Sequence, residues 1–362
     1  MATRNLVLCV DGTNDFAARY PTHVFRLFRA LERSDQQLIY YDGGVGTLLQ
    51  AKLLAKPLIA IYNAIDLAAG FSIRDNFIKA YEFLCDNYRE GDQIYLFGFS
   101  RGAYTARAVA AAISYYGIPG PEHKNLIPFM WQRFQSCGEV EHDNPDAESP
   151  FASMANLKGA LTEANSDRRK AKVHFLGVWD TVSSFGLINL KTLPGTSKLK
   201  NVVHVRHAVS IDEKRNMFPE NLVNKDRDNV KEVWFAGVHR DVGGGGDKDK
   251  RGLSMCAYEW LLSEATGLRL DETKIDPKLV IKADPNGADN SSALMVLIYA
   301  IAGIIPMKMW SKDGFAWKWL NLWHTRPIPD GATIHWSVQE RKNYNPSNLR
   351  RAKNLVYLEK PQ

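Results

Sequence analysis

The sequence predicts an α/β fold in which a mostly parallel β-sheet is covered by helices on both faces, with additional cap or insert helices. Two observations predict it. Short segments that are apolar on both faces are typical of strands in a covered parallel sheet, and segments with helical periodicity separate them. The chain has 362 residues, of which 45% are hydrophobic, enough for one large core. No stretch dominated by Pro, Gly and Ser divides it, so we expect a single domain over residues 1–362.

Five segments have the strand pattern: residues 6–10, 37–41, 93–97, 173–178 and 232–238. The clearest helix is residues 73–88, where apolar side chains recur at helical spacing and charged ones lie between them. A second helix is expected after Ser100, where small residues would let it lie close against the sheet. Residues 202–211 are expected to be helical as well.

Three segments exceed a minimal core of sheet and helices: residues 47–71, 117–172 and about 284–330. The first is apolar and helix-prone apart from Pro57, the second mixes Pro, Trp and charge, and the third is apolar and then rich in Trp. We expect these inserts to shape a substrate cleft as a cap or lipid-facing region.

Composition excludes several classes of function. The net charge is +6, but the basic residues are scattered rather than gathered in a stripe, so nucleic-acid binding is not expected. The four cysteines are far apart in the sequence, which favours a reducing compartment over a disulfide or zinc framework. The apolar residues 6–10 are too few for a signal peptide, so we expect cytoplasmic synthesis without one. The apolar run of residues 293–307 is shorter than the ~20 residues that a membrane-spanning helix needs.

The pentapeptide Gly98-Phe99-Ser100-Arg101-Gly102 lies between an expected strand and an expected helix. In that context Gly-x-Ser-x-Gly is a nucleophile elbow, where both glycines allow a sharp turn and the serine is held in a strained backbone conformation. Ser100 is therefore the candidate nucleophile, and a merely glycine-rich turn is the alternative.

A nucleophilic serine needs a histidine base and an acid that fixes the histidine tautomer. In a parallel sheet, functional residues lie just beyond the carboxyl ends of strands. His239 occupies such a place, whereas His204 and His207 fall in the expected helix and His174 inside a strand. The alternative for any one of them is a structural histidine.

Asp180 ends the strand of residues 173–178 and its short continuation, so it is the candidate acid. Asp212 and Asp241 are rivals, and a helix cap or turn is the structural alternative for Asp180. The order Ser100, Asp180, His239 is the chain order of α/β-hydrolases.

Acyl transfer also requires N–H donors for the developing oxyanion. The backbone of Arg101, at the start of the helix, is one candidate, and Gly12 or Thr13 after the first strand would supply the second. Carboxylates at strand ends, namely Asp11, Asp15 and Asp241, could alternatively hold a divalent cation. No ligand spacing supports that alternative, so neither a metal nor a cofactor is expected.

Motifs along nearly the whole chain resemble one family: residues 10–14, 41–47, 91–104, 177–182, 207–213 and 234–245. It is the bacterial and fungal α/β-hydrolase family that includes the type VI secretion phospholipase effectors, a group of lipase effectors. The resemblance implies an α/β-hydrolase fold and a triad of Ser100, Asp180 and His239. It further implies hydrolysis of lipid esters, delivery without a cleaved signal peptide, and a cognate immunity protein as partner.

Residues 293–323 give a separate reason to expect lipid contact. The tryptophans Trp310, Trp317, Trp319 and Trp323 follow the apolar run and alternate with lysines. Indole rings at headgroup level and ammonium groups on anionic phosphates suit a membrane interface. A buried cap helix followed by an ordinary aromatic core is the alternative.

These observations predict a serine esterase or lipase, a phospholipase of the A type, acting through an acyl-enzyme on lipid carboxylic esters. A soluble carboxylesterase acting on small esters is the second hypothesis. A non-catalytic binding module with this fold is the third.

Overall fold

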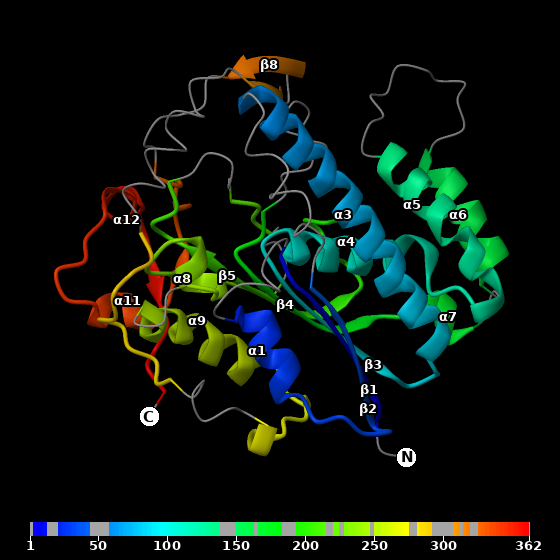
Figure 1. The fold of residues 1–362 in the computed structure, drawn as a ribbon, viewed down its shortest axis with the longest axis horizontal. Coiled ribbons are helices and arrows are strands. Elements are labelled where there is room, and N and C mark those ends of the chain that lie inside the picture. Colours follow the sequence, from blue (N-terminus) through cyan, green and yellow to red (C-terminus); the bar gives the residue numbers. More distant parts are fainter. Residues whose placement is uncertain are drawn as a thin grey trace.

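The computed structural model describes residues 3–12, 21–43, 58–137, 150–162, 166–182, 193–214, 220–223, 228–246, 250–274, 281–291, 307–311, 314–318 and 325–361. Within them lies one eight-stranded sheet in the order β10-β9-β6-β5-β4-β3-β1-β2. Every pairing between neighbours in this described sheet is parallel. The expected α/β fold with a parallel sheet is therefore confirmed (Figure 1).

The strands of the sheet are β1 (Asn5–Val10), β2 (Gln37–Asp42), β3 (Gln93–Phe99), β4 (Val173–Trp179), β5 (Val202–Ser210), β6 (Val230–Phe235), β9 (Thr333–Ile334) and β10 (Val356–Tyr357). β1 is buried at all six positions and β3 at six of its seven, because both faces of the sheet are covered. The five predicted strands correspond to β1, β2, β3, β4 and β6, although β6 begins and ends earlier than residues 232–238.

The prediction of a helix over residues 202–211 is wrong, because this segment is the central strand β5. Its valines are β-branched and pack well on a pleated surface between β4 and β6. Its polar residues are accommodated in the interior by carboxylates. Arg206 Nε donates to Glu264 Oε2 at 2.6 Å, and His207 Nδ1 lies 2.9 Å from Glu232 Oε2.

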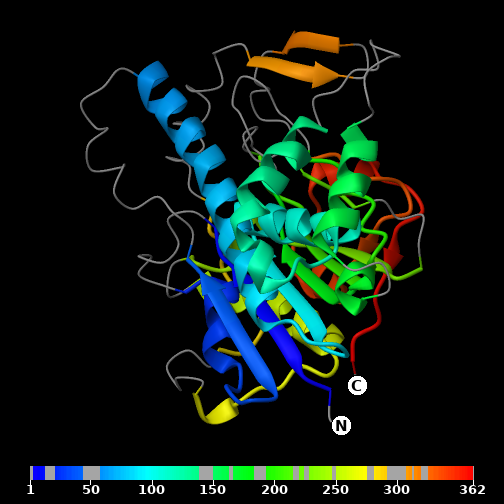
Figure 2. The same ribbon diagram turned by 90° about the vertical axis from the view of Figure 1, so that its right-hand side faces the viewer.

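Helices form a layer on each side of the sheet (Figures 1 and 2). α3 (Leu58–Asn87) and α4 (Arg101–Tyr116) share one core cluster with Leu6 and Leu8 of β1. α1 (His23–Ala30) and α9 (Arg251–Glu264) share the opposite cluster with Val7 and Cys9. The two-residue alternation of side chains along β1 thus divides the core into two halves.

α3 contains the predicted helix of residues 73–88 and extends it back to Leu58, into the first insert. The remainder of that insert, residues 47–57, lies outside the described residues. None of the helices that the structure describes combines the length and the apolar character needed to cross a membrane.

The second insert contains the 3₁₀ helix η1 (Pro121–Leu126) and the helices α5 (Ile127–Ser136), α6 (Pro150–Leu161) and α7 (Asp167–Lys170). The third contains an antiparallel hairpin of β7 (Met307–Ser311) and β8 (Gly314–Lys318). Both views place this hairpin at the end of the molecule where α3 begins. The remaining elements are α8 (His239–Gly243), η3 (Glu272–Lys274), α11 (Trp336–Glu340) and α12 (Ser347–Arg351).

Candidate active site

Ser100 occupies a sharp turn between β3 and α4, with φ 57° and ψ −123°. A positive φ is strained for a residue with a side chain and persists only where the surroundings impose it. The two flanking glycines provide those surroundings. A Cβ on Gly98 would lie 2.6 Å from Ala103 Cα, and one on Gly102 would lie 2.2 Å from the carbonyl oxygen of Val10. The turn therefore has the sharp strand-to-helix geometry and the positive φ at the serine that a nucleophile elbow requires.

Asp180 follows β4 directly and also has a positive φ, 40°. Because β3 and β4 are parallel neighbours, Ser100 and Asp180 leave the sheet side by side. The Ser100 N–H donates to the carbonyl of Trp179 at 3.1 Å, and the Val182 N–H donates to the carbonyl of Ser100 at 3.3 Å. The two strand ends thus hold both residues at the same edge of the sheet.

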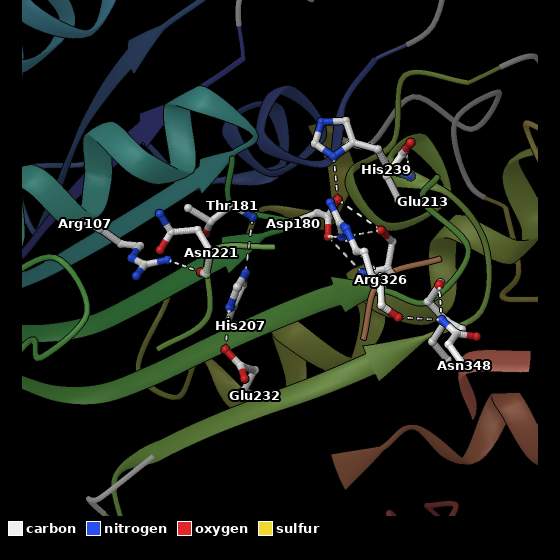
Figure 3. Close-up of polar contacts among 12 residues, drawn as sticks. Arg107, Asp180, Thr181, His207, Glu213, Asn221, Glu232, His239, Arg326 and Asn348 are labelled. Atoms are coloured by element: carbon white, nitrogen blue, oxygen red, sulfur yellow. Dashed lines mark hydrogen bonds and ion pairs between the residues drawn. The ribbon is translucent and has the colours of Figure 1, made fainter. Parts of the chain in front are cut away.

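His239 begins α8 and turns its ring toward Asp180 (Figure 3). Its Nδ1 lies 2.6 Å from Asp180 Oδ2, and both residues are buried. The ring of Phe99, the residue before Ser100, packs against the imidazole with 4.5 Å between centroids. A side chain at Gly243 would overlap that Phe99 ring, so this glycine leaves room for the contact. The structure therefore joins Asp180 to His239 and places Phe99, next to Ser100, against the imidazole.

Arg326 is a further partner of Asp180, and it lies far away in the sequence. Its Nη1 donates to Asp180 Oδ1 at 2.6 Å and to Ser210 Oγ at 2.7 Å. Burial by itself would raise the pKa of Asp180, but the charge of Arg326 and the bond to His239 outweigh burial and hold that pKa well below its ordinary value. No pattern in the sequence pointed to Arg326.

The rival acids Asp212 and Asp241 hold the backbone of the loop that carries His239. Asp212 Oδ2 accepts from the Gly237 N–H at 2.7 Å, and Asp241 Oδ2 accepts from the Val238 N–H at 2.8 Å. Glu213 adds a third such bond, from the His239 N–H at 3.2 Å. Burial raises the pKa of Asp241 to about 6. The acid that contacts the Nδ1 of His239 is Asp180.

A second histidine and acid lie beneath this pair (Figure 3). His207 Nδ1 lies 2.9 Å from Glu232 Oε2, and His207 Nε2 accepts from the Thr181 N–H at 3.2 Å. In this arrangement Nδ1 carries a proton and donates to the carboxylate. His207 therefore holds the backbone immediately after Asp180, a role that the predicted helix for this segment concealed.

Of the three predicted oxyanion donors, Arg101 and Gly12 belong to the described part of the chain. Arg101 is the first residue of α4, a helix of 16 residues whose N-terminus favours negative charge. The Gly12 N–H already donates to Asp11 Oδ1 at 2.8 Å, and Asp11 Oδ2 accepts from Thr22 Oγ1 and from the Tyr41 hydroxyl. Thr13 lies outside the described residues.

The alternative of a divalent cation involves one residue, Asp15, that lies outside the described part of the chain. Among the residues that are described, no three His, Cys, Asp or Glu side chains group as metal ligands would. Asp11 and Asp241 both accept hydrogen bonds from protein groups.

The tryptophans predicted to contact lipid are only partly described. Trp310 lies in β7, where its backbone pairs with Phe315, and Trp317 lies in β8, where it pairs with Lys308. Trp319 and Trp323 lie outside the described residues.

The chain is similar to several known proteins. A curated relative, the uncharacterized protein YEL023C of Saccharomyces cerevisiae (strain ATCC 204508 / S288c), is 32% identical over 224 residues, which are 60% of this chain and 32% of the relative. An uncharacterized protein from Pseudomonas aeruginosa has a solved structure with 19% identity and a TM-score of 0.42, covering 77% of this chain and 49% of that one.

The Tle1 effector bound to the VgrG spike from the type 6 secretion system is 15% identical with a TM-score of 0.32, covering 69% of this chain and 52% of that chain. The chain thus spans about a third of the curated relative and about half of each solved chain. Residues 4–264 match the model of the family described as "T6SS, Phospholipase effector Tle1-like, catalytic domain". Because that match covers most of the chain, the protein belongs to the Tle1-like family of phospholipase effector catalytic domains.

Proposed function

We propose that the protein is a serine esterase that hydrolyses carboxylic esters of lipids, as a phospholipase of the A type, with Ser100, His239 and Asp180 as its triad. The observation that carries the proposal is the 2.6 Å contact between His239 Nδ1 and Asp180 Oδ2 beside the strained backbone of Ser100. Membership of the Tle1-like family supports the choice of phospholipids as substrate.

The contact supports the following roles for the three side chains. His239 donates from Nδ1 to Asp180, so its Nε2 carries the lone pair and acts as the base. As Nε2 takes the hydroxyl proton of Ser100, the serine oxygen attacks the ester carbonyl, and the ionised Asp180 stabilises the imidazolium. Collapse of the tetrahedral intermediate breaks the ester bond, and His239 protonates the leaving lysophospholipid. A water that His239 deprotonates then hydrolyses the acyl-enzyme.

The oxyanion would be bound by backbone N–H groups at the start of α4. Arg101 supplies one donor and the helix dipole adds to it. Thr13 is the better second donor, because the Gly12 N–H is engaged by Asp11.

The inserts at residues 47–71, 117–172 and about 284–330 would cap the cleft and face the lipid. The β7–β8 hairpin, which carries Trp310 and Trp317, lies at the end of the molecule where α3 begins. α3 ends at Asn87, whose carbonyl accepts from Arg4 beside the start of β1. The end of α3 therefore lies at the amino ends of the strands, and the start of α3 lies toward their carboxyl ends. The hairpin lies at that start, so it too lies toward the carboxyl ends of the strands. This placement favours contact of the hairpin with a membrane surface near Ser100.

Family membership also supports a biological setting. The protein would be delivered as an antibacterial effector by a type VI secretion system, without a cleaved signal peptide, and a cognate immunity protein would neutralise it in the producing cell.

Replacing Ser100 with Ala tests the proposal. S100A should fold as the wild type does but lose labelling by a fluorophosphonate and release of lysophospholipid from vesicles, measured by mass spectrometry. Ser136→Ala, at the end of α5, where the hydroxyl donates to the Arg133 carbonyl, is the matched control and should retain both activities. Vesicle hydrolysis by S100A at the wild-type rate would refute the assignment. Hydrolysis of short-chain esters with vesicles left intact would identify a soluble carboxylesterase instead.

A further inference from the structure

The acid of the proposed triad forms a buried ion pair with a residue from outside the segment that matches the family. The side chains of Arg326 and Asp180 are 4% and 1% exposed, and their nearest nitrogen and oxygen are 2.6 Å apart. The family match ends at residue 264, so Arg326 belongs to a later segment of the chain that also contributes to the site.

Arg326 is itself held in place by the end of β5 (Figure 3). Its carbonyl accepts from Asn348 Nδ2 at 3.1 Å, and the same amide group donates to the Ile211 carbonyl at 2.8 Å. Its Nη1 contacts the Ser210 hydroxyl as well as Asp180. Residues 325–361 also contribute β9 and β10 to the sheet, so the chain that follows the arginine is anchored to the core.

The two oxygens of Asp180 share Ser210 as a partner and differ in the others. Oδ2 faces His239 and accepts from Ser210 Oγ at 3.1 Å, whereas Oδ1 accepts from Arg326 at 2.6 Å and from the Ser210 N–H at 2.9 Å. Donors on Oδ1 fix the rotation of the carboxylate and thereby aim Oδ2 at Nδ1 of the imidazole.

We propose that Arg326 is a positioning residue that orients Asp180 and balances its charge, so that residues 325–361 complete the active site. The inference rests on the proposed function, because it assigns Arg326 a role in the same triad. It predicts that a chain truncated after the family match, near residue 264, would lack a functional part of the site.

The charge of Arg326 has a consequence for the dependence of activity on pH. Catalysis requires an ionised Asp180 and a neutral His239. A cation beside this pair disfavours protons on both, so its removal lets both take up protons at higher pH. Among the described residues, the acidic groups around the pair are Glu213 and Asp212 after β5, Asp241 on α8, and Glu220, which interacts electrostatically with Arg326 and Asp180. His207, paired with Glu232, lies beneath the pair. The acid limb of the pH–rate profile should therefore move to higher pH when Arg326 is neutralised.

Three substitutions test the inference with fluorophosphonate labelling and phospholipid hydrolysis measured from pH 4 to 9. In Arg326→Met, kcat/KM should fall about 100-fold through kcat, with KM nearly unchanged, and the acid limb should rise by about one pH unit. Arg326→Gln keeps a donor for Asp180 but no charge. It should therefore lose less activity than Arg326→Met, and its acid limb should still lie at higher pH than that of the wild type. Arg326→Lys keeps the charge and should retain the wild-type limb. Arg341→Met is the control, because Arg341 belongs to the same segment but donates to Pro285 and Gly287.

Identical acid limbs in the Gln and Lys variants would overturn the inference, and so would an equal shift in Arg341→Met. The Gln and Lys pair remains decisive if Arg326→Met does not fold. A wild-type protein with no labelling that depends on Ser100 would instead overturn the proposed function, and this inference with it. If the wild type is active and the Arg326 variants have the same pH–rate profile, the inference about Arg326 would be overturned and the proposed function would stand.

Discussion

At the scale of single residues, the site depends on two strained positions. Ser100 and Asp180 both have positive φ, and each follows a buried parallel strand directly. Strain of this kind costs of order 1–3 kcal/mol per residue and needs a rigid surrounding. At Asp180 the surrounding is polar: Ser210 and Arg326 bind its carboxylate, and His207 accepts from the next N–H in the chain. The strain is therefore held by hydrogen bonds that also orient the acid.

Replacing Asp180 with Asn separates the proposed acid from its rivals. The amide no longer stabilises the imidazolium and favours the wrong tautomer of His239, so kcat/KM should fall by about 10⁴-fold. Asp212→Asn keeps an oxygen that accepts from the Gly237 N–H and the Tyr344 hydroxyl and should retain most of the activity. Steady-state kinetics on phospholipid vesicles measures both. Equal losses in the two variants would contradict the assignment of Asp180.

At the scale of elements, the first turn of α4 lies directly on the end of β1. A Cβ on Gly102 would lie 2.2 Å from the carbonyl oxygen of Val10 and 2.5 Å from that of Asp11, both of them backbone atoms. Neither partner can swing away as a flexible side chain would. The close approach fixes the distance between the N–H of Arg101 and the loop after β1, which are the two proposed sources of oxyanion donors.

Gly102→Ala should push α4 away from β1 and disturb both folding and catalysis. We expect the free energy of unfolding to fall by about 1–3 kcal/mol, as for other overpacked sites, and kcat to fall with it. Gly159→Ala in α6 is the matched control, because its Cβ would meet nothing within 4 Å. That change should raise the free energy of unfolding by about 0.5–1 kcal/mol. Urea unfolding and vesicle hydrolysis measure the two effects, and a neutral Gly102→Ala would show that the contact can relax.

At the scale of the whole molecule, the two covered faces of the sheet enclose ionisable groups that cannot easily take up protons. His23 lies among Trp179 and Tyr258, and its Nε2 contacts the carbonyl of Ser254 at 2.9 Å. Burial, followed by the charge of Arg26, lowers the pKa of His23 to about 3. Burial also lowers the pKa of His335 to about 3.

These buried histidines should make the protein less stable in acid. The unfolded chain binds a proton on His23 near pH 6.5, whereas the folded protein binds it only near pH 3. The free energy of unfolding should therefore fall by about 1.4 kcal/mol per pH unit for each such histidine as the pH falls through this window. Asp180, whose pKa is lowered, should also reduce the free energy of unfolding as the pH falls below the ordinary pKa of an aspartate. Asp241, whose pKa is raised, should increase the free energy of unfolding as the pH falls from about 6 to about 4.

His23→Gln should weaken this dependence, because the amide can donate to Ser254 and does not titrate. When the free energy of unfolding is measured with urea between pH 5 and 7.5, its slope against pH should be shallower for this variant than for the wild type. His123→Gln in η1, with a side chain 37% exposed, serves as the control and should keep the wild-type slope. An unchanged slope in His23→Gln would show that His23 does not control acid stability.

The sequence by itself determined the features that depend on local chemistry and strand order. Apolar segments gave the five strands, and glycines around Ser100 gave the elbow, because these patterns act over a few residues. The positions of Asp180 and His239 just past strands also followed, since the carboxyl ends of parallel strands meet at one edge. The prediction of a helix over residues 202–211 was wrong, because packing between two neighbouring strands outweighed the local conformational preference of these residues.

Only the tertiary structure decided which side chains surround the acid. Arg326 and Asp180 are 146 residues apart, and no periodicity relates a tail residue to a strand end. The same holds for His207, whose contact with Thr181 exists because β4 and β5 lie side by side. A buried charge is tolerated where an opposite charge or hydrogen bonds reach it, and the path of the whole chain through space decides which groups do so.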